Sequence, residues 1–122
     1  MVGYTREQLL DKVNRQTITI SSTMVVQGMP LSPVPVGKTR YIFAIDYKET
    51  ANQAVTVIIS DSTTQAGMEN PIEQQGLVGN GYVPKLQDTD SPLFAINSGR
   101  YFNIQLSNDD ATVIINVSWY DL

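Results

Sequence analysis

The chain has 122 residues, of which 42% are hydrophobic and 16% charged, and this length suits a single domain with its own core. It contains no cysteine and no histidine, which excludes disulfides, thiolate metal sites, Ser–His–Asp catalysis and most zinc sites. Twelve acidic against eight basic side chains give a formal net charge of −4, the wrong sign for a protein that binds nucleic acid non-specifically.

The first predicted element is a short helix that begins near Thr5. Thr5 and Gln8 have the spacing of a capping box, in which each side chain accepts a hydrogen bond from the backbone N–H of the other residue. Tyr4 and Leu9 hold the two positions of a hydrophobic staple. A helix of about ten residues is not stable alone, so we expect it to dock on the chain's own β core or on a neighbouring subunit.

Residues 1–16 are therefore predicted to form an N-terminal helical arm in front of a single β domain that spans residues 17–122. The apolar stripe of this arm is predicted to consist of Leu9, Leu10 and Val13, with Tyr4 stapled on Leu9. A stripe of this size is modest for holding a core and sufficient for joining subunits. We expect it to be an assembly contact.

The pattern changes at Thr17 to the period-two alternation of β-strands. A strand is predicted over 17–26, and prolines at 30, 33 and 35 indicate an extended crossing after it. Strands over 38–48 and 54–60 are predicted to pair as a hairpin. One face of the first of these strands is predicted to hold Tyr41, Phe43, Ile45 and Tyr47.

Residues 61–92 interrupt this rhythm, with β-capable pieces around Ile72 and over 82–86, and we expect a long ordered loop there with at least one short strand, near 81–86. A short strand over 92–96 follows, and Gly99 is suited to a positive φ in the next turn. Residues 100–107 and 112–120 are predicted to form the final hairpin. The inward side chains of these two strands are predicted to be Phe102, Ile104, Leu106, Val113, Ile115, Val117 and Trp119.

Short strands at intervals of 8–12 residues, separated by turn residues, predict an all-β fold. We expect an antiparallel β-sandwich or jelly-roll-like barrel of about seven or eight strands. A parallel α/β fold would need helical crossovers, and the sequence predicts only the N-terminal helix.

Two acidic clusters are the candidate metal sites. Asp109 and Asp110 are adjacent, and Asp88 lies near Asp90, so carboxylate oxygens are available for calcium. The spacing of an EF-hand is absent, and Asp in such positions normally stabilises a turn. We predict turns and neither a metal nor another cofactor, with calcium as the alternative.

The aromatic residues allow a second interpretation, a platform for sugars made from Tyr41, Tyr47, Tyr82, Tyr101, Tyr120 and Trp119. Trp119 alternates in phase with core positions, which favours a place in the core. Tyr101 and Tyr120 fall out of phase with the core faces, and we predict that they are exposed assembly contacts.

Four segments form one pattern: VPVGK at 34–38, YIFAID at 41–46, PLFAINSG at 92–99 and VIINVSWY at 113–120. With these segments the chain resembles small accessory structural proteins of tailed bacteriophages and related viruses, of the decoration, head–tail or fibre type. The resemblance implies a β-sandwich without catalytic residues. It also implies that terminal arms tie neighbouring subunits together.

The predicted function is that of a non-enzymatic virion structural protein, a capsid decoration or head–tail accessory subunit. We expect it to assemble with itself, as a trimer or another ring, and with another virion protein. The charged fraction of 16% is below the roughly 25% typical of soluble domains, as expected for a surface covered by other subunits. A glycan- or ligand-binding module is the alternative.

The expected location is the virion, after synthesis in the host cytoplasm, without contact to nucleic acid or membrane. No apolar run approaches the roughly 20 residues needed to span a bilayer. The N-terminus also lacks the charged and apolar regions of a signal peptide.

Overall fold

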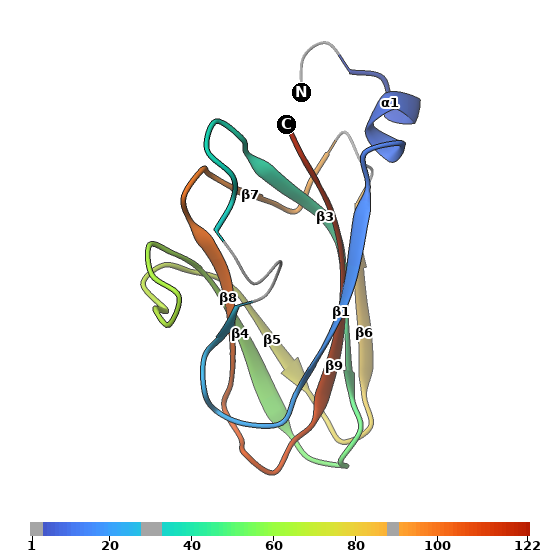
Figure 1. The fold of residues 1–122 in the computed structure, drawn as a ribbon. Helices are drawn as coiled ribbons and strands as arrows, with labels where there is room; N and C mark the ends of the chain where they lie inside the picture. Colours follow the sequence, from blue (N-terminus) through green and yellow to red (C-terminus); the bar gives the residue numbers. More distant parts are fainter. Residues whose placement is uncertain (1–3, 28–32, 88–90) are drawn as a thin grey trace.

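The computed structural model describes residues 4–27, 33–87 and 91–122, which form two packed antiparallel sheets with one short helix at the N-terminal end (Figure 1). The elements in chain order are α1 Arg6–Leu10, β1 Asn14–Ile20, β2 Val26–Gln27, β3 Arg40–Glu49, β4 Val55–Ser62, β5 Pro71–Leu77, β6 Tyr82–Leu86, β7 Phe94–Ile96, β8 Tyr101–Leu106 and β9 Val113–Asp121.

The strand order in the sheets is that of a jelly roll. Sheet A has the order β1-β9-β3-β6, with β7 also paired to β3, and sheet B has the order β2-β8-β4-β5. The chain passes from one sheet to the other at every connection except those from β4 to β5 and from β6 to β7. This is the pattern of two interlocked Greek keys. The predicted fold class, an antiparallel sandwich or jelly roll with a short N-terminal helix, is confirmed.

The core lies between the sheets and is built from alternate side chains of their inner faces. The inward residues predicted for the last two strands are all buried, from Phe102 to Trp119. Trp119 is additionally covered by the Arg40 guanidinium, which lies 5.5 Å from the ring centroid and forms an ion pair with Asp121 at 2.8 Å. The alternation in the sequence therefore identified the core positions of this part correctly.

The two predicted hairpins are wrong, because the strands of each pair lie in opposite sheets. β3 belongs to sheet A and β4 to sheet B, and β8 and β9 are divided in the same way. Instead, β9 pairs with β1 and β3, and β8 pairs with β2 and β4. A period of two shows which side chains face the core, but it is the same for a hairpin and for a connection between sheets.

The strand predicted over 17–26 is two strands in different sheets. β1 ends at Ile20 and β2 begins at Val26, so Met24 lies in the connection between them and is 74% exposed. The Thr23 N–H donates a hydrogen bond of 2.8 Å to Asp109 Oδ1. This contact holds the connection against the turn before β9.

A β-bulge in β3 corrects the predicted face of Tyr41, Phe43, Ile45 and Tyr47. The register with β9 shifts between Ile42 and Ala44, so Ile45 and Tyr47 face the core between the sheets, whereas Phe43 and Tyr41 face outward. One extra residue in a strand exchanges the two faces from that point on.

The region 61–92 contains more structure than predicted. β6 confirms the expected strand near 81–86, and β7 confirms the strand expected over 92–96. The β-capable piece around Ile72 forms β5, a strand for which no bounds were predicted. Its sequence, PIEQQGL, lacks an apolar alternation because β5 is an edge strand in which only Leu77 is buried. Gly99 has the predicted positive φ, 76°.

The N-terminal helix has the predicted capping box but is only five residues long. Thr5 Oγ1 accepts from the Gln8 N–H at 3.2 Å, and Gln8 Oε1 accepts from the Thr5 N–H at 2.8 Å. The predicted single stripe is wrong, because Leu9 is fully buried while Leu10 is 50% exposed. In the described part of the chain, no helix is long and apolar enough to cross a membrane.

We expect Trp119→Ala to lower the free energy of unfolding by about 3–5 kcal/mol, because it removes a large side chain that is 6% exposed. Urea denaturation at 25 °C measures this loss. Asp109→Asn serves as the control and is expected to change the value by less than about 0.5 kcal/mol, because asparagine keeps the acceptor for Thr23. A calcium-dependent gain in stability that Asp109→Asn abolishes would contradict the assignment of a simple turn.

Candidate assembly surface

A second apolar cluster lies on the outer face of sheet A, beneath α1. Leu9, Phe43 and Tyr120 are buried together there, and the rings of Tyr41 and Tyr120 stack with their centroids 5.5 Å apart. We call this the outer cluster; its partly buried members are Val13, Tyr41, Ala44 and Leu122. The N-terminal helix was expected to dock either on the chain's own β core or on a neighbouring subunit. In the structure it docks on the chain's own β domain.

The residues predicted as assembly contacts occupy three different environments. Leu9 and Tyr120 are fully buried inside the chain. Val13 and Tyr101 are half-buried, Val13 against the outer cluster. The exposed ones are Leu10 and Tyr4, whose ring lies 5.4 Å from the Lys12 ammonium.

Tyr120 was predicted to be exposed because it is out of phase with the inward residues of β9. It does point away from the core between the sheets, but α1 and Phe43 cover that outer face. The arm boundary also differs from the prediction, since β1 begins at Asn14, before residue 17. The covering of an outer sheet face by another segment is a tertiary contact that alternation does not reveal.

Below the outer cluster, polar side chains form a row across sheet A. Thr17 Oγ1 donates to Asn116 Oδ1 at 2.6 Å, and Asn116 Nδ2 donates to Asp46 Oδ1 at 2.8 Å. The Tyr82 hydroxyl lies 3.4 Å from Asp46 Oδ2 at the far end. This polar row connects β1, β9, β3 and β6, so the exposed part of the face is rich in hydrogen-bonding groups.

The polar row borders an open hollow of about 360 Å³. Its lining combines one cation, one carboxylate and several amide or hydroxyl groups; the residues are Arg15, Gln16, Thr17, Asp46, Asn116, Val117 and Ser118. The lining is polar and the hollow wide, which suits contact with a protein surface more than the enclosure of a small apolar ligand.

Glu49 is the most unusual ionisable group of the fold, because its side chain is 0% exposed and nevertheless charged. Its Oε1 accepts from the N–H groups of Gln53 at 3.0 Å and Asn80 at 3.2 Å. Its Oε2 accepts from those of Ala51 at 2.8 Å and Thr112 at 3.1 Å. Burial alone would raise the pKa of this carboxyl, but the four N–H donors outweigh burial and lower the pKa to about 2.

The four donors to Glu49 belong to three connections between the sheets, β3–β4, β5–β6 and β8–β9. The carboxylate therefore ties one end of the sandwich together. Sequence reasoning missed this residue, since a glutamate at the end of a strand is usually solvated. The three loops that surround it come from distant parts of the chain.

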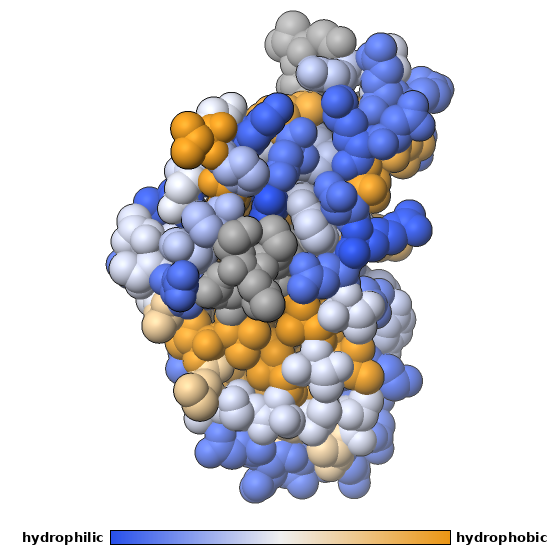
Figure 2. Space-filling model, viewed as in Figure 1, coloured by the Kyte–Doolittle hydropathy of each residue, from blue (hydrophilic) through white to orange (hydrophobic). Residues whose placement is uncertain are grey.

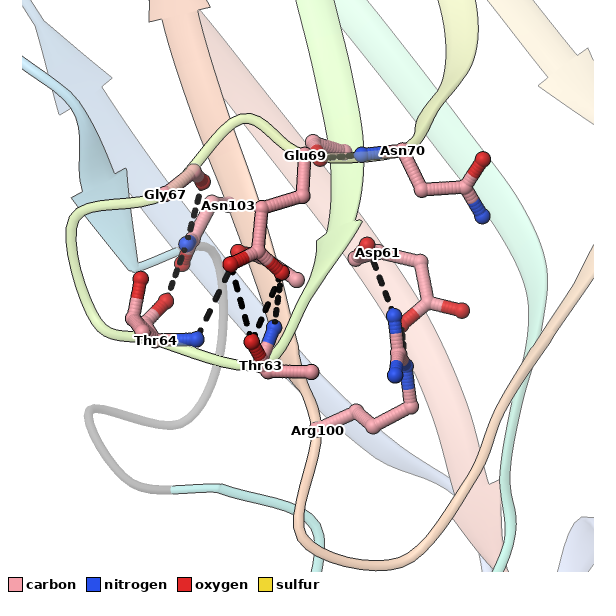
Figure 3. A network of polar contacts seen from close by, with 10 residues as sticks. Asp61, Thr63, Thr64, Gly67, Glu69, Asn70, Arg100 and Asn103 are labelled. Carbon is pink, nitrogen blue, oxygen red and sulfur yellow. Dashed lines mark hydrogen bonds and ion pairs between the residues drawn. The ribbon is translucent and has the colours of Figure 1, made fainter.

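The connection between β4 and β5 is held by a polar network on sheet B (Figure 3). Asn103 alternates with the predicted inward residues of β8, yet it is buried, and its Nδ2 donates to Thr64 O at 2.9 Å and Gly67 O at 2.8 Å. The Glu69 carboxylate accepts from the Thr63 N–H at 2.8 Å, which lowers the pKa of this glutamate.

An ion pair between Arg100 and Asp61 completes this network beside the loop. These contacts join β8, the end of β4 and the segment that follows it. The expected ordered loop is thus stabilised by hydrogen bonds and charge, with little apolar packing of its own.

The acidic residues considered for calcium do not form a cluster in the described residues. Asp109 accepts from Thr23, and Asn108 Oδ1 accepts from the Asp110 N–H at 2.9 Å, as in a normal Asx turn. Asp88 and Asp90 lie outside the described residues. Among those residues no group of three or more Asp and Glu side chains is placed to hold a metal ion.

Comparison with known proteins gives matches in structure alone. No known protein-family model matches the sequence, and no curated protein matches it. A chain in the acidic stable capsid structure of Helicobacter pylori bacteriophage KHP30 is similar with a TM-score of 0.52 and 8% identity, over 90% of this chain and 92% of that chain.

The crystal structure of a protein named PirA is similar to the same degree, with a TM-score of 0.52 and 11% identity over 87% of this chain and 93% of that chain. At these identities the similarity shows the fold. The β-sandwich fold implied by the resemblance to phage structural proteins is confirmed, because a phage capsid structure contains a chain of this fold and nearly this extent.

We expect Leu9→Ala to lower the free energy of unfolding by about 2–5 kcal/mol, because it opens a cavity in the outer cluster. Leu10→Ala on the same helix is the matched control and should cost less than about 0.5 kcal/mol, since Leu10 is exposed. Urea denaturation compares the two variants. Equal effects would show that α1 does not pack through Leu9.

We expect Glu49→Gln to lower the melting temperature at pH 7 far more than Glu7→Gln, which changes an exposed glutamate of α1. The glutamine side chain has no charge, and its NH2 group would face backbone N–H groups, so that donors meet donors. Because the folded-state pKa of Glu49 is about 2 and the ordinary value is 4.5, this stability is present above pH 4.5 and is lost as the pH falls towards 2.

Circular dichroism melts between pH 7 and pH 2 follow this loss. The difference in melting temperature between wild type and Glu49→Gln should narrow across the interval from pH 4.5 to pH 2. A constant difference over the whole range would show that the charge of Glu49 does not stabilise the loops.

Proposed function

We propose that this chain is a non-enzymatic structural protein of a virion, a capsid decoration or head–tail accessory subunit. The observation that carries the proposal is the jelly roll shared with a chain of a phage capsid structure over 90% of one and 92% of the other. Both chains are thus little more than the sandwich itself. Sequence segments that resemble phage structural proteins support the same assignment independently.

The use of the ionisable groups supports a structural role over catalysis. Glu49 holds backbone N–H groups, Arg40 pairs with Asp121, and Lys85 pairs with Glu73. These charges stabilise strands and connections. In addition, the sequence offers neither histidine nor cysteine for acid–base or nucleophilic chemistry.

The alternative function, a glycan-binding platform, loses most of its aromatic residues to the interior. Tyr47, Tyr120 and Trp119 are buried, and Tyr41 and Tyr101 are half-buried. Of that predicted platform, Tyr82 is the member with an exposed ring, at 56%. Sugars bind through the faces of exposed rings, so this distribution favours protein–protein assembly.

The proposed partners are copies of this chain, in a trimer or another ring, and another virion protein. Leu10 and Tyr4 on the arm remain the proposed contacts for this assembly, since both side chains are exposed, and Figure 1 shows that α1 lies at one end of the sandwich. The proposed place of action is the virion. Closed symmetric assemblies are the usual outcome of such subunit contacts.

We expect light scattering between micromolar and millimolar concentration to show a homo-oligomer of the 13.5 kDa chain. The double variant Tyr4→Ser/Leu10→Ser should shift the distribution towards the monomer, because it removes the exposed apolar groups of the arm. The control is Val78→Ser, which changes an even more exposed apolar residue between β5 and β6. A monomer at all concentrations would contradict the proposed function.

A further inference from the structure

The edges of the two sheets differ in how well they are protected against pairing with another strand. In the described residues the edge strands are β1, β6 and the three-residue β7 in sheet A, and β2 and β5 in sheet B. β6 contains Pro84 at its centre, which interrupts the row of N–H donors along the free edge. β2 has only two residues, and β5 begins with Pro71 and contains Gly76.

β1 is the exception, because its seven residues, NRQTITI, include neither proline nor glycine. In the described residues it pairs only with β9. A long β-branched edge strand of this kind is a template for the addition of another strand. Proteins normally interrupt such an edge with proline, with a bulge or with inward-pointing charges.

The two sides of the sandwich also differ in how they are closed. On the side of β5 and β6, Lys85 Nζ of sheet A lies 2.9 Å from Glu73 Oε1 of sheet B. On the side of β1 and β2, Figure 2 shows an apolar patch between the two sheets, next to β1. Met24, 74% exposed, and the half-buried Val26 belong to the segment that crosses this side.

We propose that β1 pairs antiparallel with β1 of a second copy of this chain around a twofold axis at Thr17, a contact that rests on the proposed self-assembly and specifies its interface. When a strand pairs antiparallel with the same strand of a second copy, one symmetric contact satisfies the free backbone N–H and C=O groups of both edges. This explains why an unprotected edge is retained beside an exposed apolar patch. The partner covers both.

The charge pattern of β1 selects this register. Arg15 is the single charged residue of the strand, and the axis at Thr17 is the one that pairs all seven residues. Arg15 then lies opposite Thr19 of the second copy, and the two arginines are four residues apart along the pair, or about 13 Å. At this distance salt screens their repulsion almost completely.

The same register places Thr17 opposite its own copy, a favourable cross-strand pair. The polar row of sheet A then continues from Asp46 and Asn116 through both threonines into the second copy. One sheet would run through two subunits. A twofold contact of this kind joins rings or trimers to one another and leaves their own symmetry unchanged.

The experiment uses Thr17→Cys in a chain that contains no cysteine of its own. Directly opposed residues of an antiparallel pair have Cα atoms about 4.5–5.5 Å apart, which lies within the range for a disulfide. Under mild oxidation we expect Thr17→Cys to form a covalent dimer almost completely on a non-reducing gel. Gln74→Cys, exposed on edge strand β5, is the control and should remain mostly monomeric.

A second pair of variants tests the contact without a crosslink. Thr17→Lys places two ammonium groups opposite each other across the axis and should shift the light-scattering mass towards smaller species, whereas Gln74→Lys should not. Circular dichroism verifies that both variants are folded. A third readout is hydrogen exchange, because the β1 amides should become less protected when the wild-type protein is diluted.

The outcomes separate this inference from the proposed function. An oligomer in which Thr17→Cys crosslinks no better than Gln74→Cys overturns the β1 contact and leaves the structural role intact. A monomer at every concentration overturns both. Crosslinking by Thr17→Cys, together with a smaller mass for Thr17→Lys, supports the β1 contact.

Discussion

The charged carboxylate of Glu49 holds together the end of the jelly roll at which the β3–β4, β5–β6 and β8–β9 connections lie. It is buried, and it accepts hydrogen bonds from the N–H groups of Ala51, Gln53, Asn80 and Thr112. These groups belong to three connections that pass between the sheets. A neutral side chain at this position would leave buried N–H donors without acceptors, and such groups are costly. The fourth connection at this end is tied separately, by Thr23 to Asp109.

Because of the bulge in β3, apolar side chains of this strand pack on both faces of sheet A. Before it, Ile42 faces the core between the sheets, and after it Ile45 and Tyr47 do. Phe43, at the bulge, turns outward to meet Leu9 and Tyr120. The helix therefore docks where Phe43 and Tyr120 give the outer face of sheet A an apolar surface. The rest of that outer face carries the polar row and remains accessible.

These features together determine which parts of the surface remain exposed. One end is closed by hydrogen bonds to Glu49, one side is closed by the Lys85–Glu73 ion pair, and one part of the outer face is covered by α1. What remains exposed is rich in hydrogen-bonding groups, with the edge of β1 beside an apolar patch. Such a distribution is consistent with the proposed virion role and with self-association through strand edges.

The sequence by itself determined the fold class, the capping box at Thr5 and the core positions of the last two strands. These are local properties, since alternation and cap spacing depend only on neighbouring residues. Phe102 and Trp119 were placed correctly for this reason. The strands of the N-terminal half were predicted less accurately, because the bulge in β3 and the break after Ile20 interrupt the alternation without a clear signal in the residue types.

Only the tertiary structure decided which strands pair, and therefore which charges and edges matter. The sequence does not show that β3 and β4 lie in opposite sheets, because a turn and a crossing have the same composition. It also does not show that Glu49 is buried, since its partners at residues 80 and 112 are distant in the chain. Tyr120 and Leu9 were expected at a subunit interface and are instead packed together, because their alternation is equally compatible with both environments. The physical reason is that pairing and burial are decided by contacts between distant segments, which a single strand's pattern does not encode.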